Sequence, residues 1–104
     1  MRFSWDTAKA RTNLKNHGIS FEAATEVFSD PGHITTENYF IEDEGEQRYG
    51  TIGLTRHGIL LLVVFVERTE SEARYETTPE TIHIISARKA QSYETKIYNA
   101  HIEN

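Results

Sequence analysis

Apolar and polar residues recur with a helical period near the N-terminus of this chain. Asp6 is a suitable N-cap and Gly18 can adopt the left-handed conformation that ends a helix, so we predict a helix over about 7–17. Its apolar stripe comprises Ala10, Leu14 and His17. Ser20 is the N-cap of a second predicted helix over about 21–29, joined to the first by a tight turn.

The middle of the chain changes to the shorter spacing that is typical of strands. We predict four strands, at about 34–36, 48–54, 59–66 and 81–86. The run at 59–66 has no polar alternation, so both of its faces should be buried and it should lie centrally in the sheet. The segments 42–46 and 69–80, rich in acids and hydroxyls, are predicted to be surface loops.

Residues 87–102 contain no glycine or proline and form the third predicted helix. Two helices, then strands joined without crossover helices, then a terminal helix predict an α+β fold with a four-stranded, mainly antiparallel sheet. A length of 104 residues suits one domain, which we expect to span 1–104.

The composition narrows the possible chemistry. The absence of cysteine excludes disulfides and thiolate catalysis. The five histidines show no i, i+4 pair, so we expect no bound metal and no cofactor. The longest apolar run, 59–66, is far shorter than the roughly 20 residues of a membrane-spanning helix, so we expect a cytoplasmic protein.

Charge is distributed unevenly along the chain. The net charge is −5, from 11 Lys and Arg against 16 Asp and Glu, which disfavours a general nucleic-acid-binding protein. Residues 1–20, however, hold four basic residues and one acid, or +3, and residues 81–104 hold three basic residues and two acids, or +1. A basic surface for an anionic ligand therefore requires the two ends to meet in space. Otherwise the chain is a solvated acidic protein.

Two motifs at opposite ends carry most of the information: Phe3-x-Trp5-Asp6-x-x-Lys9-x-x-x-Asn13-x-x-x-His17-Gly18 and Ile84-Ile85-Ser86-Ala87-Arg88-x-Ala90. In this order and at this chain length they resemble the BrnT family of bacterial type II toxin–antitoxin toxins. Further matches are Phe21-Glu22-x-Ala24-x-x-Val27-Phe28, Glu46-x-Arg48, Glu67-Arg68 and Glu94-x-x-x-Tyr98.

The resemblance to BrnT toxins implies a RelE-like fold and an endoribonuclease activity that arrests translation. It also implies neutralisation by a small BrnA-like antitoxin protein with a ribbon-helix-helix domain, so that operator DNA would be bound only through the complex. Three features depart from the family pattern. Asn16 and His83 stand where Lys and Arg are usual, and the segment 69–80 is longer and more acidic than usual.

Metal-independent RNA cleavage by the 2′-hydroxyl needs a base, an acid and a cation on the phosphoryl oxygens. Arg68 ends the predicted central strand and Arg88 begins the predicted last helix. If their strands are neighbours, both guanidiniums could bind one phosphate. The alternative is that each arginine pairs with an acid, such as Glu67 or Glu94.

His83 is a candidate general acid or base because imidazole titrates near neutral pH, although a strand histidine is also commonly ordinary half-exposed surface. His17 is a second catalytic candidate, with an alternative structural role at the C-terminal end of its helix. Glu46 is a candidate base beside Arg48 on a strand edge, or these residues form a cross-strand salt bridge.

The remaining basic and aromatic candidates concern RNA binding. Lys9, Lys15 and Arg48 could bind RNA phosphates, or they lie on ordinary solvated surface. Phe3 and Trp5 either stack on a base or anchor the N-terminal segment on the core.

The sequence leaves three functions open. The first is an endoribonuclease toxin, with RNA as substrate. The second is a non-catalytic protein-binding domain of the same fold, acting as antitoxin partner or co-repressor, with Tyr93, Ile97 and Tyr98 as its docking face. The third is an unrelated small α+β domain.

Overall fold

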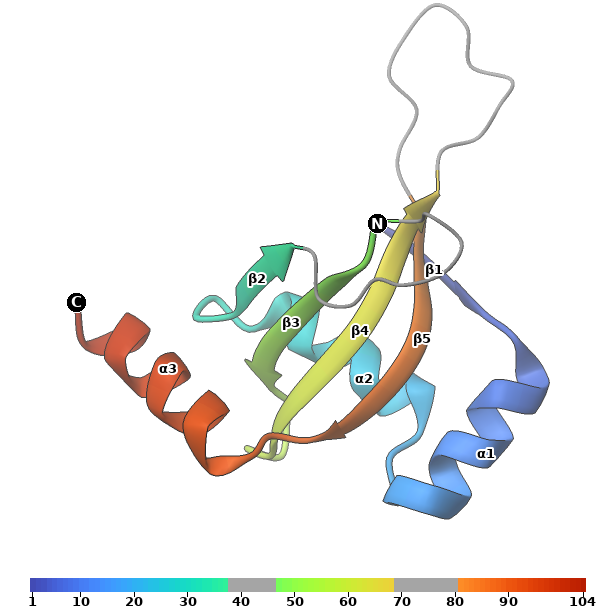
Figure 1. Ribbon diagram of the computed structural model, residues 1–104, viewed down its shortest axis with the longest axis horizontal. Helices are drawn as coiled ribbons and strands as arrows, with labels where there is room; N and C mark the ends of the chain where they lie inside the picture. The colour runs from blue at the N-terminus through green and yellow to red at the C-terminus, as the bar shows by residue number, and fades with distance from the viewer. Residues whose placement is uncertain (38–46, 69–80) are drawn as a thin grey trace, which may run out of the picture.

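The structure of the protein, a computed structural model, describes residues 1–37, 47–68 and 81–104 (Figure 1). Within these ranges, helices pack around one sheet. The elements are β1 (Arg2–Trp5), α1 (Thr7–His17), α2 (Phe21–Thr25), the 3₁₀ helix η1 (Glu26–Ser29), β2 (Ile34–Glu37), β3 (Tyr49–Leu54), β4 (Leu60–Arg68), β5 (Thr81–Lys89) and α3 (Ser92–Glu103). Nowhere in the described ranges is a helix long and apolar enough to cross a membrane.

The strands of the described sheet follow the order β1-β5-β4-β3-β2. The pairs β2/β3, β3/β4 and β4/β5 are antiparallel. The predicted α+β class is confirmed, and β4 is the central strand. Both faces of β4 are buried as predicted, since the following residues are at most 3% exposed: Leu61, Leu62, Val63, Phe65 and Val66.

The sheet has a strand that the sequence analysis missed. β1 pairs in parallel with the start of β5, with Phe3 opposite Ile82 and Trp5 opposite Ile84. The predicted four-stranded sheet is therefore wrong in number, and the described sheet is mixed. A segment of four residues is too short to show a strand period, and its aromatic residues read equally well as an anchor.

The last strand and last helix have different limits from those predicted. β5 continues to Lys89, so Arg88 lies in a strand and does not begin the helix. Residues 87–90 are all suited to a helix, but pairing with β4 overrides that local preference. α3 begins at Ser92, where Gln91 and Glu94 form a capping box.

The larger part of the core lies on the face of the sheet that we call the first face. Figure 1 shows α2 behind the strands on this face. Its buried residues include Phe21, Ala24, Val27, Leu61, Val63, Phe65, Ile82, Ile84 and Ala87. Gly53 lets η1 approach the sheet, because a Cβ there would lie 2.9 Å from both the Cβ and the carbonyl oxygen of Val27.

α3 lies on the opposite face, which we call the second face. Tyr98 is buried there against Ile52 and Leu62. Its hydroxyl donates a 2.6 Å hydrogen bond to Asp30, which also accepts from the backbone N–H of Leu54. These bonds fasten α3 to the β3 side of the sheet.

Candidate active site along strand β5

The two ends of the chain meet along β5. β1 pairs with the first half of β5 and ends at Trp5, opposite Ile84. Asp6 then caps α1 by accepting hydrogen bonds from the N–H groups of Ala8 and Lys9, and α1 continues beside the second half of β5 (Figure 1). The N-terminal segment of charge +3 therefore lies beside the C-terminal segment of charge +1. The two basic ends therefore meet, which is the condition for a basic surface that could bind an anionic ligand.

Asn13 joins α1 to β5 through its side chain. The amide nitrogen donates to the carbonyl oxygens of Ala87 (2.8 Å) and Ile19 (3.0 Å), and the amide oxygen accepts from the N–H of Ala87 (3.1 Å). Of the predicted apolar stripe of this helix, Ala10 packs against the core, but His17 is exposed and Leu14 is 51% exposed. The buried position is instead Asn13, which is 6% exposed. A strand edge needs polar partners, and the helix supplies one by turning an amide inward.

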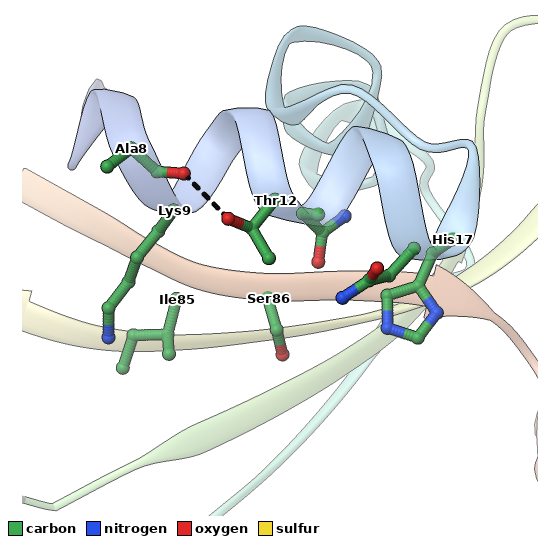
Figure 2. A pocket seen from close by; sticks show the side chains of 8 residues that line it. Ala8, Lys9, Thr12, His17, Ile85 and Ser86 are labelled. Atoms are coloured by element: carbon green, nitrogen blue, oxygen red, sulfur yellow. Dashed lines mark hydrogen bonds between the residues drawn. The ribbon is translucent and has the colours of Figure 1, made fainter.

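A groove of about 310 Å³ lies between α1 and β5. Figure 2 shows Lys9 near one end, His17 at the other, and Thr12 and Ser86 between them. Among the described residues, Lys15 is not part of the groove lining. It follows Lys9 by six positions, or about 240° around the helix, and so projects from another side. The structure thus brings Lys9 and His17 to one groove without Lys15.

His83 lies half-buried on β5 between two other strands. It pairs with Val66 of β4 on one side and with Ser4 of β1 on the other. The hydroxyl oxygen of Ser4 is 2.8 Å from Nδ1 of His83. Directly paired residues point to the same side of a sheet, so these three side chains lie on the second face.

Two arginines flank Thr81, the neighbour of His83 on the same face of β5. Thr81, two residues earlier on β5 and hence on the same face, pairs with Arg68 of β4 and with Arg2 of β1. The structure therefore brings together two of the predicted catalytic residues, Arg68 and His83. It adds Arg2, which the sequence analysis did not single out.

Arg48 approaches the same group from β3. It immediately precedes Tyr49, which pairs with Phe65, so its main chain lies at the level of Val66. Val66 in turn pairs with His83. Two strand spacings, about 10 Å, therefore separate the main chains of Arg48 and His83.

A β-bulge keeps the polar residues of β5 on one face. The register with β4 shifts between Val64 and Phe65, and Ile85 is skipped. Without this extra residue, Ser86 would point toward the first face, because side chains alternate along a strand. The bulge therefore places Ser86 on the second face together with His83.

Arg88 is held by a buried acid. Its Nη1 and Nη2 atoms lie 2.9 and 2.8 Å from the two carboxylate oxygens of Glu94, whose side chain is 2% exposed. Burial alone would raise the pKa of Glu94, but hydrogen bonds from Arg88 and from the N–H of Gln91, together with the Arg88 charge, hold it below its usual value. For Arg88, the acid-paired alternative is therefore the one observed.

The proposed sharing of one phosphate by Arg68 and Arg88 is wrong. Their strands are neighbours, as the proposal required, but they are antiparallel. Arg68 pairs with Thr81, and Arg88 lies seven residues further along β5. Because one of these residues is the bulge, Arg88 pairs with Leu62, six positions from Arg68 along β4, and at about 3.3 Å per residue the main chains are roughly 20 Å apart. Side chains stand roughly perpendicular to their strand, so the two guanidiniums do not meet at one phosphate. Arg68 belongs with His83, whereas Arg88 lies near the far end of the strand.

Two further sequence-based expectations concern Glu46 and metal ions. Glu46 lies outside the described residues, so its role as a base stays a prediction. Across the described part of the chain, His, Asp and Glu side chains form no group of three or more that could hold a metal ion.

Ser4 and Ser86 also lie on this face, although neither was predicted to be a site residue. Ser4 alternates with the apolar Phe3 and Trp5, but this segment is too short for the alternation to predict a strand. Alternation could not place Ser86 either, since its direction depends on the bulge.

Comparisons with known proteins agree with this fold. A family model described as the ribonuclease toxin BrnT of type II toxin–antitoxin systems matches residues 5–94. Among solved structures, the chain is similar to the crystal structure of the Brucella abortus ribonuclease toxin BrnT, with a TM-score of 0.54 and 21% sequence identity. That match covers 88% of this chain and 99% of the other, and at this identity it shows the fold. A comparison with curated proteins found no match.

Proposed function

Because the chain belongs to the BrnT family of ribonuclease toxins of type II toxin–antitoxin systems, we propose that it is a metal-independent endoribonuclease. RNA would bind the second face, with the scissile phosphate beside His83. One observation carries this proposal. Ser4 and His83, 79 residues apart in sequence, are in contact, and Arg2, Arg68 and Arg48 lie in the same or the adjacent row of the sheet.

His83 would transfer the proton during cleavage. The 2′-hydroxyl oxygen loses its proton and attacks phosphorus, and the 5′-oxygen of the next nucleotide leaves and takes up a proton. Imidazole accepts and donates protons near neutral pH, and Arg68 can stabilise the charge on the phosphoryl oxygens. Arg88, paired with Glu94, is better suited to fixing the end of β5.

The groove between α1 and β5 would hold a neighbouring part of the RNA strand. Ser86, which lines the groove, pairs with Val64, two positions along β4 from the partner of His83, so it lies about 7 Å from His83 along the strand. Lys9 and His17 can bind phosphate oxygens there, with an affinity that falls as salt rises. We therefore expect His17 to act in binding, not in proton transfer at His83.

The direct test is digestion of a single-stranded oligoribonucleotide by the purified chain, with and without EDTA. We expect equal cleavage in EDTA and products that end in a 2′,3′-cyclic phosphate. A 2′-deoxynucleotide before the scissile bond should block cleavage. Cleavage that requires a divalent ion, or that continues past the 2′-deoxynucleotide, would contradict the proposed chemistry.

A binding experiment tests the groove separately. Lys9→Ala should lower the slope of log affinity against log salt by about 0.7, the value for one lost contact to a single strand. Lys15→Ala is a matched control, because this lysine lies on the same helix outside the groove. Equal effects of the two substitutions on this slope would show that RNA does not bind in the groove.

We also propose that cleavage arrests translation, that residues 1–104 act as a single toxin domain, and that a BrnA-like antitoxin with a ribbon-helix-helix domain neutralises it. Membership of a toxin–antitoxin family implies an antitoxin partner. Expression of the chain in a bacterium should halt protein synthesis, and coexpression of the protein encoded beside it should restore synthesis. Operator DNA should be bound by the complex and not by the toxin alone, whose net charge is −5.

A second candidate function is that of a non-catalytic protein-binding domain. The pairing of Arg88 with Glu94 supports it, as do the exposures of Tyr93 (54%) and Ile97 (46%) on α3. Tyr98, the third residue of the expected docking face, is buried and cannot contribute. A chain that binds its antitoxin but leaves RNA intact would favour this candidate over the endoribonuclease.

A further inference from the structure

Ser4 contacts the ring of His83 across the pairing of β1 with β5. Its hydroxyl oxygen lies 2.8 Å from Nδ1, and the two residues stand opposite each other in the register. We propose that Ser4 is a positioning residue: it accepts a hydrogen bond from Nδ1–H of His83 and leaves Nε2 as the nitrogen that transfers the proton. This inference rests on the proposed function, because it names the reacting atom of that same site.

Ser4 sits in a segment that is fixed on both sides. The ring of Phe3 packs against Phe28 with centroids 5.5 Å apart, and the ring of Trp5 packs against Phe21 at 5.8 Å. Pairing with β5 holds the main chain between them. A hydroxyl in such a segment has little freedom, so it can fix the orientation of an imidazole.

The hydrogen on Nδ1 decides which nitrogen can react. Neutral imidazole carries one ring proton, so Nδ1–H leaves a lone pair on Nε2 that can take the proton of the 2′-hydroxyl. Once Nε2 has taken up a proton, both ring nitrogens carry a hydrogen, and Nδ1–H still donates to Ser4. The same holds until Nε2 gives its proton to the leaving 5′-oxygen. The contact therefore persists in both directions of proton transfer. If Ser4 donated to Nδ1 instead, the proton would sit on Nε2 and the base would be lost.

His33 provides an internal reference for this tautomer. Its Nδ1 lies 2.7 Å from the carbonyl oxygen of Asp30. A carbonyl oxygen only accepts hydrogen bonds, so this Nδ1 carries the hydrogen. We expect neutral His83 to have the same tautomer as neutral His33.

Proton–nitrogen NMR spectra of protein labelled with nitrogen-15 in histidine report which ring nitrogen carries the hydrogen. At a pH where the rings are neutral, wild-type His83 should show the Nδ1–H form, and H83Q identifies its signal. Ser4→Ala should shift His83 toward the Nε2–H form and leave His33 as it is. Ser4→Thr keeps the hydroxyl and should preserve the wild-type form.

Cleavage kinetics test the consequence for the reaction. Ser4→Ala should lower kcat by about tenfold with little change in KM, the scale expected when the partner that orients a histidine is removed. Ser4→Thr should restore most of kcat. Ser29→Ala is the matched serine control, because Ser29 is exposed at the end of η1, and it should match wild type.

Two results would overturn the inference: an Nε2–H form of His83 in wild type, or a Ser4→Ala variant that keeps both the wild-type tautomer and kcat. A wild-type protein that cleaves no RNA overturns the proposed function instead. The NMR comparison then decides by itself whether Ser4 fixes the ring. Thermal melts of each variant separate these outcomes from loss of the fold.

Discussion

Asn13→Ala should strongly destabilise the protein, because this side chain connects α1 to β5. The substitution removes three hydrogen bonds, two with Ala87 and one with Ile19. Unlike an exposed amide, the side chain of Asn13 is buried. The main-chain groups that it satisfies therefore lose their partners where water replaces them poorly.

The magnitude follows from these three bonds. A hydrogen bond contributes about 1 kcal/mol net, and each buried group left unsatisfied costs about 1–3 kcal/mol. Partial entry of water through the adjacent groove favours the lower end of that range, so we expect a loss of about 3 kcal/mol. For a domain of this size, such a loss lowers Tm by roughly 12–24 °C.

Urea and thermal unfolding of the purified variants, followed by circular dichroism, would measure this loss. Asn16→Ala is the matched control, since Asn16 is exposed on the same helix and lines the same groove. We expect its effect to stay within about 0.5 kcal/mol. A loss below about 1 kcal/mol for Asn13→Ala would refute the view that this amide holds the two ends of the chain together.

Four further predictions concern other parts of the fold. Arg88→Ala should cost about 3–5 kcal/mol in urea unfolding, because it leaves the buried carboxylate of Glu94 unpaired, whereas replacing both residues with leucine should recover most of the loss. Burial alone would raise the pKa of Asp30, but hydrogen bonds from Tyr98 and from main-chain N–H groups hold this pKa below its usual 3.8. The stability that Asp30 contributes is thus present above pH 3.8 and is lost as the pH falls through the lower pKa of the folded state. In thermal melts at acid pH, Asp30→Asn should therefore make Tm less dependent on pH. Burial and the hydrogen bond to Asp30 raise the pKa of Tyr98 from 10.0 to about 12. The stability that the Tyr98 hydroxyl contributes is therefore complete below pH 10 and is lost as the pH rises toward 12. Absorbance titration of wild type and of Tyr98→Phe would show this late ionisation. Gly53→Ala should cost about 1–3 kcal/mol in thermal melts, since its Cβ would meet η1 at 2.9 Å; an unchanged Tm would contradict that close packing.

Both ends of α1 and the start of α2 were predictable because they depend on local residues. Asp6 and Ser20 cap α1 and α2 through their side chains, and Gly18 has a φ of 70°. The position of the central strand was predictable for a similar reason, since only a strand buried on both faces is apolar throughout.

The composition of the candidate site was only partly predictable, because strand order and direction are not local properties. The proposal for Arg68 and Arg88 required neighbouring strands, and these are neighbours. It failed because their antiparallel direction sends the two arginines apart. The contact of Ser4 with His83 depends on β1, which is too short to show in the sequence pattern.

The interior face of α1 could not be read from apolar periodicity. That approach placed Leu14 inside, but the neighbour of the helix is a strand edge whose main chain needs hydrogen bonds. Asn13 satisfies it, and the apolar residue turns outward. The Asn13 position in the N-terminal motif resembling BrnT toxins therefore has a structural role.

The most direct test of the account is the single-turnover rate of oligoribonucleotide cleavage by His83→Ala compared with wild type. His101→Ala, at an exposed position of α3, serves as the control. Loss of the group that transfers the proton should lower the rate by about 10²–10⁴-fold while the circular dichroism spectrum remains that of wild type. A folded His83→Ala variant that cleaves RNA at the wild-type rate would contradict the assignment of the reaction to this site.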